Sequence, residues 1–501
     1  MDSRLSTRFV IAALAATLLS GVALYFGAGL HPHWWLTWVA ALPVLLVAPS
    51  LPWVWALLTA FAASILGTLS FWKYLRSDIH MPLGAALLTL LVPAAAFALA
   101  VLMFRSFFRR GQVWLAVLAF PSLLVGYQYV IELILGSFGN TAYTQLNNLP
   151  VLQLATLTGM WGIAFLVMLF APAVAAALLS RGATRRRLVL MLAGVVAGVL
   201  AYGAWRLRAT PPVSQTVVVG LVSTQYPDNI FPSTDAQKMQ LLQKYAAQAS
   251  ALADRGAKFV VLPEMTVLAS GSLSDETDRL FEKTARDAGA KMLLGVIHVT
   301  SNAAYNEARL YSPAGAIEAI YRKRHLVPSL EARTTPASDI SVLDRPEGRM
   351  GLAICRDMDY PDPARVYGKD KVGLLLVPAW DQGAVDRWWH GHMALMRGVE
   401  YGYSIVRSAK VGFLTVSDDR GRVLAEASTM PTVPFTTLLA TVPVRHDWTL
   451  YQTLGDWFAW LNMVLLCSLV LFAFLGKRKP TTNGREERGE LIDAAPVTNT
   501  R

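Results

Sequence analysis

Long apolar runs constrain this chain more than any other feature of its sequence. Seven lie in about the first two hundred residues and an eighth near the C-terminus, at about 9–28, 34–49, 51–72, 82–104, 113–136, 156–180, 187–207 and 456–475. An α-helix needs ~20 apolar residues to cross a bilayer, and each run comes close to that length, the second being the shortest. With 54% hydrophobic and 16% charged residues, the chain of 501 residues is too apolar for an ordinary soluble enzyme. The sequence therefore predicts a polytopic membrane bundle of about eight spans.

The basic residues beside these runs predict the topology, because lysine and arginine accumulate on the cytoplasmic side of a membrane. With eight spans, one side receives Arg4, Arg8, Arg105, Arg109, Arg110, Arg181, Arg185, Arg186, Arg187, Lys477, Arg478 and Lys479. The opposite side receives the uncharged loop 137–150, although four basic residues also fall there, Lys73, Arg76, Arg206 and Arg208. The first run could be a cleavable signal peptide, but the six spans that follow at once favour a retained helix. Both termini are predicted to be cytoplasmic, and the region between the last two spans is predicted to lie outside the cytoplasm.

The remaining composition argues against several classes of partner. The net charge of +11 is explained by the span flanks and by the polar tail 477–501, which we expect to be disordered and cytoplasmic, so no nucleic-acid partner is expected. Of the two cysteines, Cys467 falls inside the last span, so no disulfide framework is indicated. His390 and His392 would point to different faces of one helix, and no second cluster completes a metal site. We expect neither a metal nor a cofactor.

Between the seventh and eighth spans the pattern changes to short strand-like and helix-like segments, which predicts one α/β domain over 214–447. The expected strands are 216–224, 258–265, 291–299, 348–355, 372–380, 404–409 and 412–418, and the expected helices are 233–257, 275–290 and 386–402. Ser233 or Thr234 is the expected N-cap of the first helix. The predicted organisation is a bundle over 1–208, the α/β domain, a last helix over 454–476 and the tail.

Three polar residues each end a strand-like segment: Glu264 ends FVVLPE, Lys323 ends AIEAIYRK, a further strand-like segment, and Cys355 ends GLAIC. Strand ends are where α/β domains carry their chemistry. Glu264, Lys323 and Cys355 would singly be read as a solvent-facing carboxylate, a solvated cation and a small core residue. Together they supply a general base, a cation that stabilises a developing oxyanion, and a nucleophile. The three residue types therefore favour thioester chemistry at Cys355.

The segments around these residues resemble the nitrilase, or carbon-nitrogen hydrolase, superfamily. The segment LPEMT carries Glu264, YNEARLYSPAGAIEAIYRKRHLVPSLE carries Lys323, and GLAICRDMDYPDPAR carries Cys355. A fourth ordered segment, from LVPAWDQG to DDRGRV, is similar to the strand, helix and hairpin that follow the cysteine in that superfamily. The resemblance implies an αββα sandwich with a Glu–Lys–Cys triad.

The membrane spans narrow the resemblance to the bacterial apolipoprotein N-acyltransferases. It implies that Cys355 takes an acyl chain from a phospholipid and passes it to the N-terminal amine of a diacylglyceryl-modified lipoprotein. It also implies that Glu331, eight residues after Lys323, supports catalysis, as Trp380 would. The implied setting is the bacterial inner membrane, with a monomeric enzyme whose catalytic domain faces the periplasm.

The residues around the cysteine depart from that family. Arg356 and Asp357 stand where an aromatic residue and a glutamate are usual, and Lys410 stands where asparagine is frequent. Arg356 could lower the thiol pKa or form an ion pair with Asp357 or Asp359 that fixes the loop. Two further hypotheses stay open: a membrane-anchored amidase that resolves the same thioester with water, and a silent domain used for binding.

Overall fold

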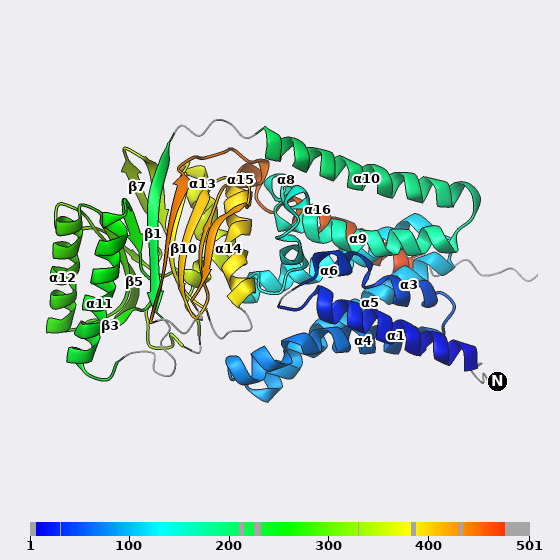
Figure 1. Ribbon diagram of the computed structural model, residues 1–501. Helices are drawn as coiled ribbons and strands as arrows, with labels where there is room; N and C mark the ends of the chain where they lie inside the picture. Colours follow the sequence, from blue (N-terminus) through cyan, green and yellow to red (C-terminus); the bar gives the residue numbers. More distant parts are fainter. Residues whose placement is uncertain are drawn as a thin grey trace, which may run out of the picture.

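The computed structural model describes residues 7–30, 32–209, 215–224, 232–328, 330–381, 387–429 and 434–475. The tail predicted over 477–501 lies outside these residues. A helical bundle and an α/β sandwich lie end to end (Figure 1).

Seven helices of the described residues are long and apolar enough to cross a membrane. They are α1 (Thr7–Gly27), α4 (Trp53–Thr68, extended to Phe71 by the 3-10 turn η1, Leu69–Phe71), α5 (Leu83–Arg109), α6 (Val113–Leu135), α9 (Met160–Leu179), α10 (Gly182–Arg208) and α16 (Trp457–Leu475). Small side chains let them approach closely, as is usual between membrane helices. Between α1 and α4, for example, a Cβ added at Gly67 would collide with Leu24. The predicted membrane bundle is confirmed for these seven runs.

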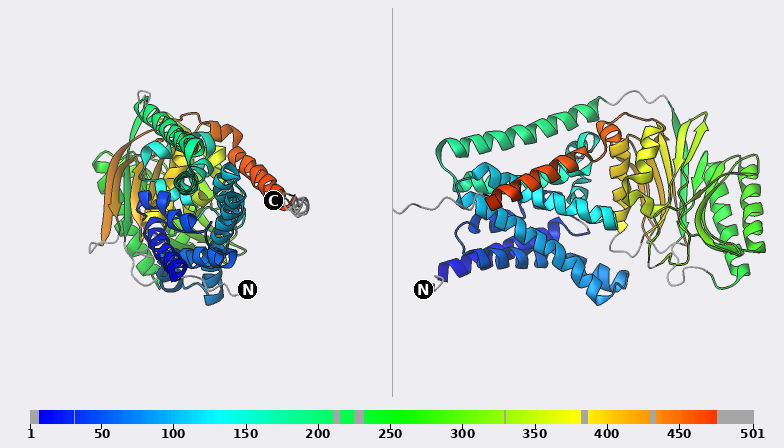
Figure 2. Two further views of the ribbon diagram at one scale, coloured as in Figure 1. Left: turned by 90° about the vertical axis from the view of Figure 1, so that its right-hand side faces the viewer. Right: turned by 180° about the vertical axis from the view of Figure 1, so that it is seen from behind.

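The second predicted span, 34–49, is wrong as a single helix. It forms two short helices, α2 (Trp34–Val39) and α3 (Leu42–Val47). Pro43 explains the break, because a proline ring clashes with the carbonyl four residues earlier, here that of Val39. The pair still returns along the bundle, so α1 begins and α16 ends at the end of the bundle away from the sandwich (Figure 2).

Short helices lie between the long helices of the bundle, at the end nearer the sandwich. They are the π-helix η2 (Tyr74–Asp78), the 3-10 helix η3 (Thr141–Gln145), α7 (Leu149–Leu152) and α8 (Ala155–Thr158). The predicted sixth span starts too early, because Gly159 adopts a positive φ of 63° and separates α8 from α9.

Two sheets form the centre of the α/β part. The first has the order β13-β1-β2-β4-β5-β6 with β3 also on β4: β1 (Thr216–Thr224), β2 (Phe259–Val261), β3 (Val267–Ser270), β4 (Lys291–Val299), β5 (Ala304–Tyr311), β6 (Ile317–Arg322) and β13 (Phe435–Pro443). The second has the order β12-β11-β10-β9-β8-β7: β7 (Ser341–Arg345), β8 (Gly348–Leu352), β9 (Leu374–Trp380), β10 (Ser404–Lys410), β11 (Phe413–Ser417) and β12 (Val423–Ser428). Their facing sides share one apolar core, which includes Leu221, Leu352 and Val406.

Helices cover both outer faces and complete the predicted αββα sandwich. α11 (Asp235–Asp254) and α12 (Ser272–Ala288) pack on the first sheet, and α13 (Pro361–Lys369) and α14 (Arg387–Tyr401) pack on the second. Thr234 caps α11 through a capping box with Gln237, as expected from its sequence. The α13–α14 layer faces the bundle, and α15 (Leu450–Leu454) leads into α16 (Figure 1). The second sheet is therefore the one mounted on the membrane part.

Candidate active site

The three residues singled out in the sequence follow strands of both sheets. Glu264 lies in the turn after β2, Lys323 directly follows β6, and Cys355 follows β8 and begins the 3-10 helix η4 (Cys355–Asp359). The backbone N–H of Glu264 donates to the carbonyl of Ala379 on β9, at 3.2 Å, and so ties the first sheet to the second. The site therefore lies where the strand ends of the two sheets meet.

One ammonium group lies between two buried carboxylates. Lys323 Nζ is 2.7 Å from Glu264 Oε1 and 2.7 Å from Glu331 Oε2. Asn306 Nδ2 donates to the same two side chains, at 2.7 Å to Glu264 and 2.6 Å to Glu331. The backbone N–H of Val327 adds a hydrogen bond to Glu331 at 2.7 Å. All four side chains are at most 4% exposed, so water contributes little to their stabilisation.

This cluster keeps the lysine charged and makes Glu264 a stronger base. Burial lowers the pKa of Lys323, but Glu264, the Cys355 thiol and Glu331 outweigh it and raise the net pKa above its usual value. Burial raises the pKa of Glu264, an effect that the Lys323 ammonium opposes and the Glu331 carboxylate reinforces. A buried carboxylate with a raised pKa accepts a proton more readily than one in water.

Cys355 sits at a strained position in the backbone. Its φ is +44°, a region that residues other than glycine rarely adopt. Its thiol donates to the carbonyl oxygen of Trp380 at 3.5 Å. Burial raises the pKa of the Cys355 thiol well above its ordinary value; Glu264 raises it further, whereas Lys323 and Arg407 lower it. The resting thiol is therefore protonated and needs a base before it can attack.

Asp357 holds the cysteine turn against the lysine segment. Its carboxylate accepts from Tyr321 Oη at 2.8 Å, from the N–H of Ile354 at 3.1 Å and from the N–H of His325 at 2.9 Å. The side chain is fully buried among these donors. Asp357 is thus a positioning residue for Cys355 and Lys323, whereas the sequence had left open an ion pair with Arg356.

Arg356 points to the bundle. It donates to the carbonyl of Leu326, to the carbonyl of Leu135 at the end of α6 at 3.2 Å, and to Tyr360 Oη at 3.0 Å. Of the two predicted ion-pair partners, Asp359 is the one it approaches, at 3.9 Å. Because backbone carbonyls take up the guanidinium, Arg356 fixes the loop and joins it to the membrane helices.

Sequence reasoning missed three polar groups around the thiol. They are Asn306, Lys410 and the buried ion pair Arg407–Asp381. In this pair Arg407 Nη1 lies 3.0 Å from Asp381 Oδ2. Lys410 was noted only as a departure, yet its Nζ donates to the carbonyl of Met265, beside Glu264. The sequence did carry a signal for the Arg407–Asp381 pair. Arg407 stands inside the apolar strand SIVRSAK, and a charge buried in a strand requires a partner.

A second buried ion cluster joins the sandwich to the bundle. Arg397 of α14 contacts Glu400 at 2.6 Å and, across the junction, Glu132 of α6 at 3.5 Å. Glu400 accepts the N–H of Met160 at the start of α9, at 2.9 Å. Arg397 and Glu400 therefore connect the helices α14, α6 and α9.

Comparison with known proteins assigns both parts of this arrangement. The chain matches the carbon-nitrogen hydrolase family over residues 219–444. It matches the N-terminal domain of apolipoprotein N-acyltransferases over residues 20–173. The chain belongs to the apolipoprotein N-acyltransferase family.

Curated apolipoprotein N-acyltransferases from three bacteria align with most of the chain. The protein from Geobacter metallireducens is 25% identical over 402 residues, which is 72% of this chain and 75% of the relative. The protein from Nitrosomonas europaea is 26% identical over 84% of this chain and 88% of the relative. The protein from Pasteurella multocida is 22% identical over 96% of this chain and 98% of the relative. The similarity therefore covers the membrane bundle as well as the sandwich of this N-acyltransferase family member.

Proposed function

We propose that the chain is an N-acyltransferase that moves an acyl chain from a phospholipid, through a thioester on Cys355, to the N-terminal amine of a diacylglyceryl-modified lipoprotein. The observation that carries the proposal is the buried Lys323 between Glu264 and Glu331 at the strand ends beside Cys355. The family of both parts supports the acyl transfer.

In the first half-reaction, Glu264 takes the thiol proton while Cys355 Sγ attacks the ester carbonyl of the donor. The new C–S bond gives a tetrahedral oxyanion, which the Lys323 ammonium stabilises. The C–O bond then breaks, and the lysophospholipid oxygen leaves with the proton from Glu264. Glu331 holds Lys323 in place, and the carbonyl of Trp380 orients the thiol before attack.

In the second half-reaction, the acceptor amine attacks the thioester carbonyl. Glu264 takes the proton that the amine loses, and the C–S bond breaks as an amide forms. Glu264 then returns the proton to the Cys355 sulfur. Water in place of the amine would make the chain a hydrolase, which releases a free fatty acid from the phospholipid or, with an amide as acyl donor, acts as an amidase. The fate of the thioester separates transfer from hydrolysis.

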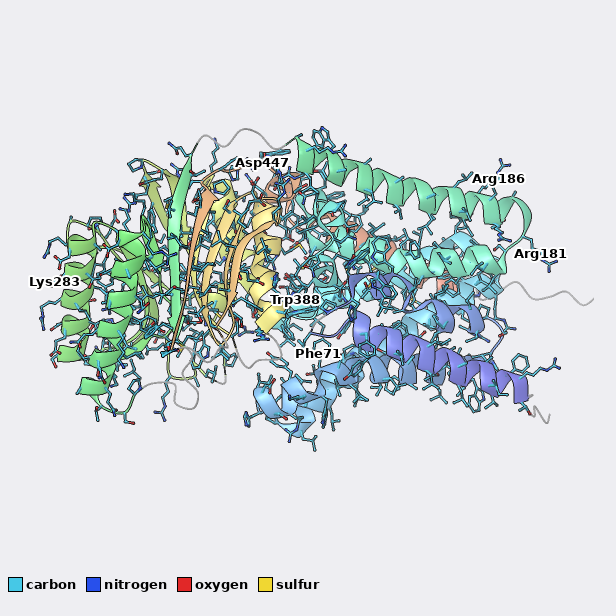
Figure 3. The ribbon with its side chains drawn as sticks, viewed as in Figure 1. Phe71, Arg181, Arg186, Lys283, Trp388 and Asp447 are labelled. Atoms are coloured by element: carbon cyan, nitrogen blue, oxygen red, sulfur yellow. The ribbon has the colours of Figure 1, made fainter. Side chains whose placement is uncertain are left out.

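We propose that the enzyme is a monomer in the bacterial inner membrane, with the catalytic domain, 214–447, outside the cytoplasm. The bundle over 1–208 and the last helix, 454–476, would hold it there, with both termini cytoplasmic. Arginines at the end of the bundle away from the sandwich, such as Arg181 and Arg186 in Figure 3, support this orientation. Donor and acceptor are both lipid-anchored, and extracting a chain would cost ~0.8 kcal/mol per methylene. A site mounted on the membrane avoids that cost.

An intact-mass measurement tests the proposal. Purified protein incubated with a phospholipid that carries an isotope-labelled acyl chain should gain the mass of one acyl group. The adduct should be lost in Cys355→Ala and retained in Cys467→Ala, the matched variant of the other cysteine, which lies on α16. An adduct that persists in Cys355→Ala, or active protein without an adduct, would refute the thioester.

A further inference from the structure

An open cavity of about 470 Å³ lies between α9 and α10. Its walls are apolar and include Ala173 and Ala177 of α9, and Val196, Ala197 and Leu200 of α10. The volume falls within the ~300–1,000 Å³ of typical ligand sites. The cavity follows the part of both helices nearer their connecting turn, which lies away from the sandwich (Figure 1). It is therefore separate from the site at Cys355.

One cation lines this otherwise apolar cavity. Arg185, in the first turn of α10, belongs to the lining, and Arg186 points away from the bundle beside it (Figure 3). The sequence contains no aspartate or glutamate between residues 133 and 227, so neither helix supplies a carboxylate to Arg185. A guanidinium at the end of an apolar groove complements a ligand with an anionic head and a hydrocarbon chain.

The length of the groove matches a membrane lipid. From Arg185 to Leu200 the helix rises by about 22 Å, at ~1.5 Å per residue. One leaflet of the hydrocarbon core is about 15 Å thick, half of ~30 Å. Lipid tails are as apolar as the groove walls, so an acyl chain gains little free energy when it moves from the bilayer into the groove. Selectivity must therefore come from the head group at Arg185.

We propose that the α9–α10 groove binds one anionic phospholipid of the leaflet farther from the sandwich, with an acyl chain between the helices and the phosphate on Arg185. Basic pockets between membrane helices bind anionic head groups in this way. The lipid is not the acyl donor, because it lies at the other end of the bundle. It supports α10, whose far end is joined to the sandwich by Arg206, 2.8 Å from Asp447.

Photocrosslinking tests this site without reference to acyl transfer. The full chain is placed in nanodiscs with phosphatidylglycerol whose acyl chain carries a photoactivatable group, and crosslinked peptides are identified by mass spectrometry. We expect crosslinks within 170–200, reduced about fivefold by Arg185→Gln and unchanged by Arg186→Gln. Ala197→Phe should fill the groove and abolish them, whereas Val195→Phe, on the same helix outside the lining, should not.

Two results would overturn the proposal. Equal labelling by phosphatidylcholine, or equal labelling of Arg185→Gln, would show ordinary bilayer contact without head-group recognition. Absence of crosslinks within 170–200 would show that the groove takes up no lipid. Both readouts are independent of whether Cys355 forms a thioester.

Discussion

At the scale of single residues, the charge balance around Lys323 determines what the site can do. Two carboxylates share one ammonium, so the cluster carries one negative charge in excess. Burial raises the pKa of Glu264 and the Glu331 carboxylate reinforces that shift, whereas the Lys323 ammonium opposes it. A raised pKa suits a proton acceptor beside a protonated thiol. The raised pKa keeps Lys323 charged, so in the proposed mechanism it stabilises the oxyanion and does not donate a proton.

Lys410 gives a prediction on pH dependence. Burial lowers its pKa to about 7, and Glu264 opposes the shift. The unfolded chain, with a lysine pKa of 10.5, binds more protons between these two values, so the contribution of Lys410 to stability rises with pH in that window. Relative to Lys410→Met, the wild-type free energy of unfolding should rise on the order of 3 kcal/mol between about pH 7 and pH 9.5.

Unfolding in detergent at several pH values measures this difference. The nearby charges that face the site, Glu264, Lys323, Arg407 and Asp381, are unchanged in the variant. Lys283→Met, at an exposed lysine on the outer helix α12, should give a difference that does not vary with pH. A flat difference for Lys410→Met as well would contradict a buried, titrating lysine.

At the residue scale, the sequence predicted the groups with distinctive chemistry and missed those defined by their neighbours. Glu264, Lys323 and Glu331 lie together as their motifs implied. Asn306 could not be identified, because an amide in a strand has no pattern that separates a buried partner from an exposed side chain. For Arg356 the sequence left open a lowered thiol pKa or an ion pair with Asp357 or Asp359. The contacts of Arg356 and Asp357 depend on backbone groups of Leu135 and His325, which belong to distant segments.

At the scale of elements, α14 is the joint between the sandwich and the bundle. Arg397 is fully buried and contacts Glu400, Glu132 and the hydroxyl of Ser137, the last at 3.2 Å. Burial lowers the pKa of Arg397, but Glu400 and its other neighbours outweigh it, so the guanidinium stays charged. The carboxylates on either side depend on this one cation.

Arg397→Leu should therefore destabilise the junction. Removing one partner of a buried ion pair leaves unpaired charge and costs about 3–5 kcal/mol. We expect a lower unfolding temperature and faster proteolysis of the connection between α10 and β1, with reduced acyl-enzyme formation. Lys283→Ala, which removes an exposed ion pair with Asp287 on α12, is the control and should change none of these. Unchanged proteolysis of Arg397→Leu would show that other contacts hold the two parts together.

Helices and strands were predictable from the sequence where the local pattern of apolar residues determines them. The strands β1 and β4 coincide with their predicted ranges, because both are continuous apolar runs. β13 was not predicted: its polar and apolar residues mix, and it becomes a strand by pairing with β1, which lies more than 200 residues earlier. The break between α2 and α3 was missed because hydropathy does not register the steric effect of Pro43.

At the scale of the whole molecule, the layer order explains why the chain needs both parts. The α13–α14 layer of the sandwich rests on the bundle (Figure 2). The turn that carries Cys355 contacts the end of α6 through Arg356. Cys355, the proposed nucleophile, is thereby held at the end of the membrane helices nearer the sandwich. Two substrates that stay in the lipid could then reach one thiol in turn.

In the proposed reaction, an amine and not water resolves the thioester on Cys355. The most direct measurement isolates the labelled acyl-enzyme and follows its mass after adding a diacylglyceryl peptide with a free N-terminal amine. We expect the adduct to disappear as an N-acylated peptide forms in equal amount, and to persist with the N-acetylated peptide or with buffer alone. Loss of the adduct at the same rate in every case, with release of free fatty acid, would contradict the proposed reaction.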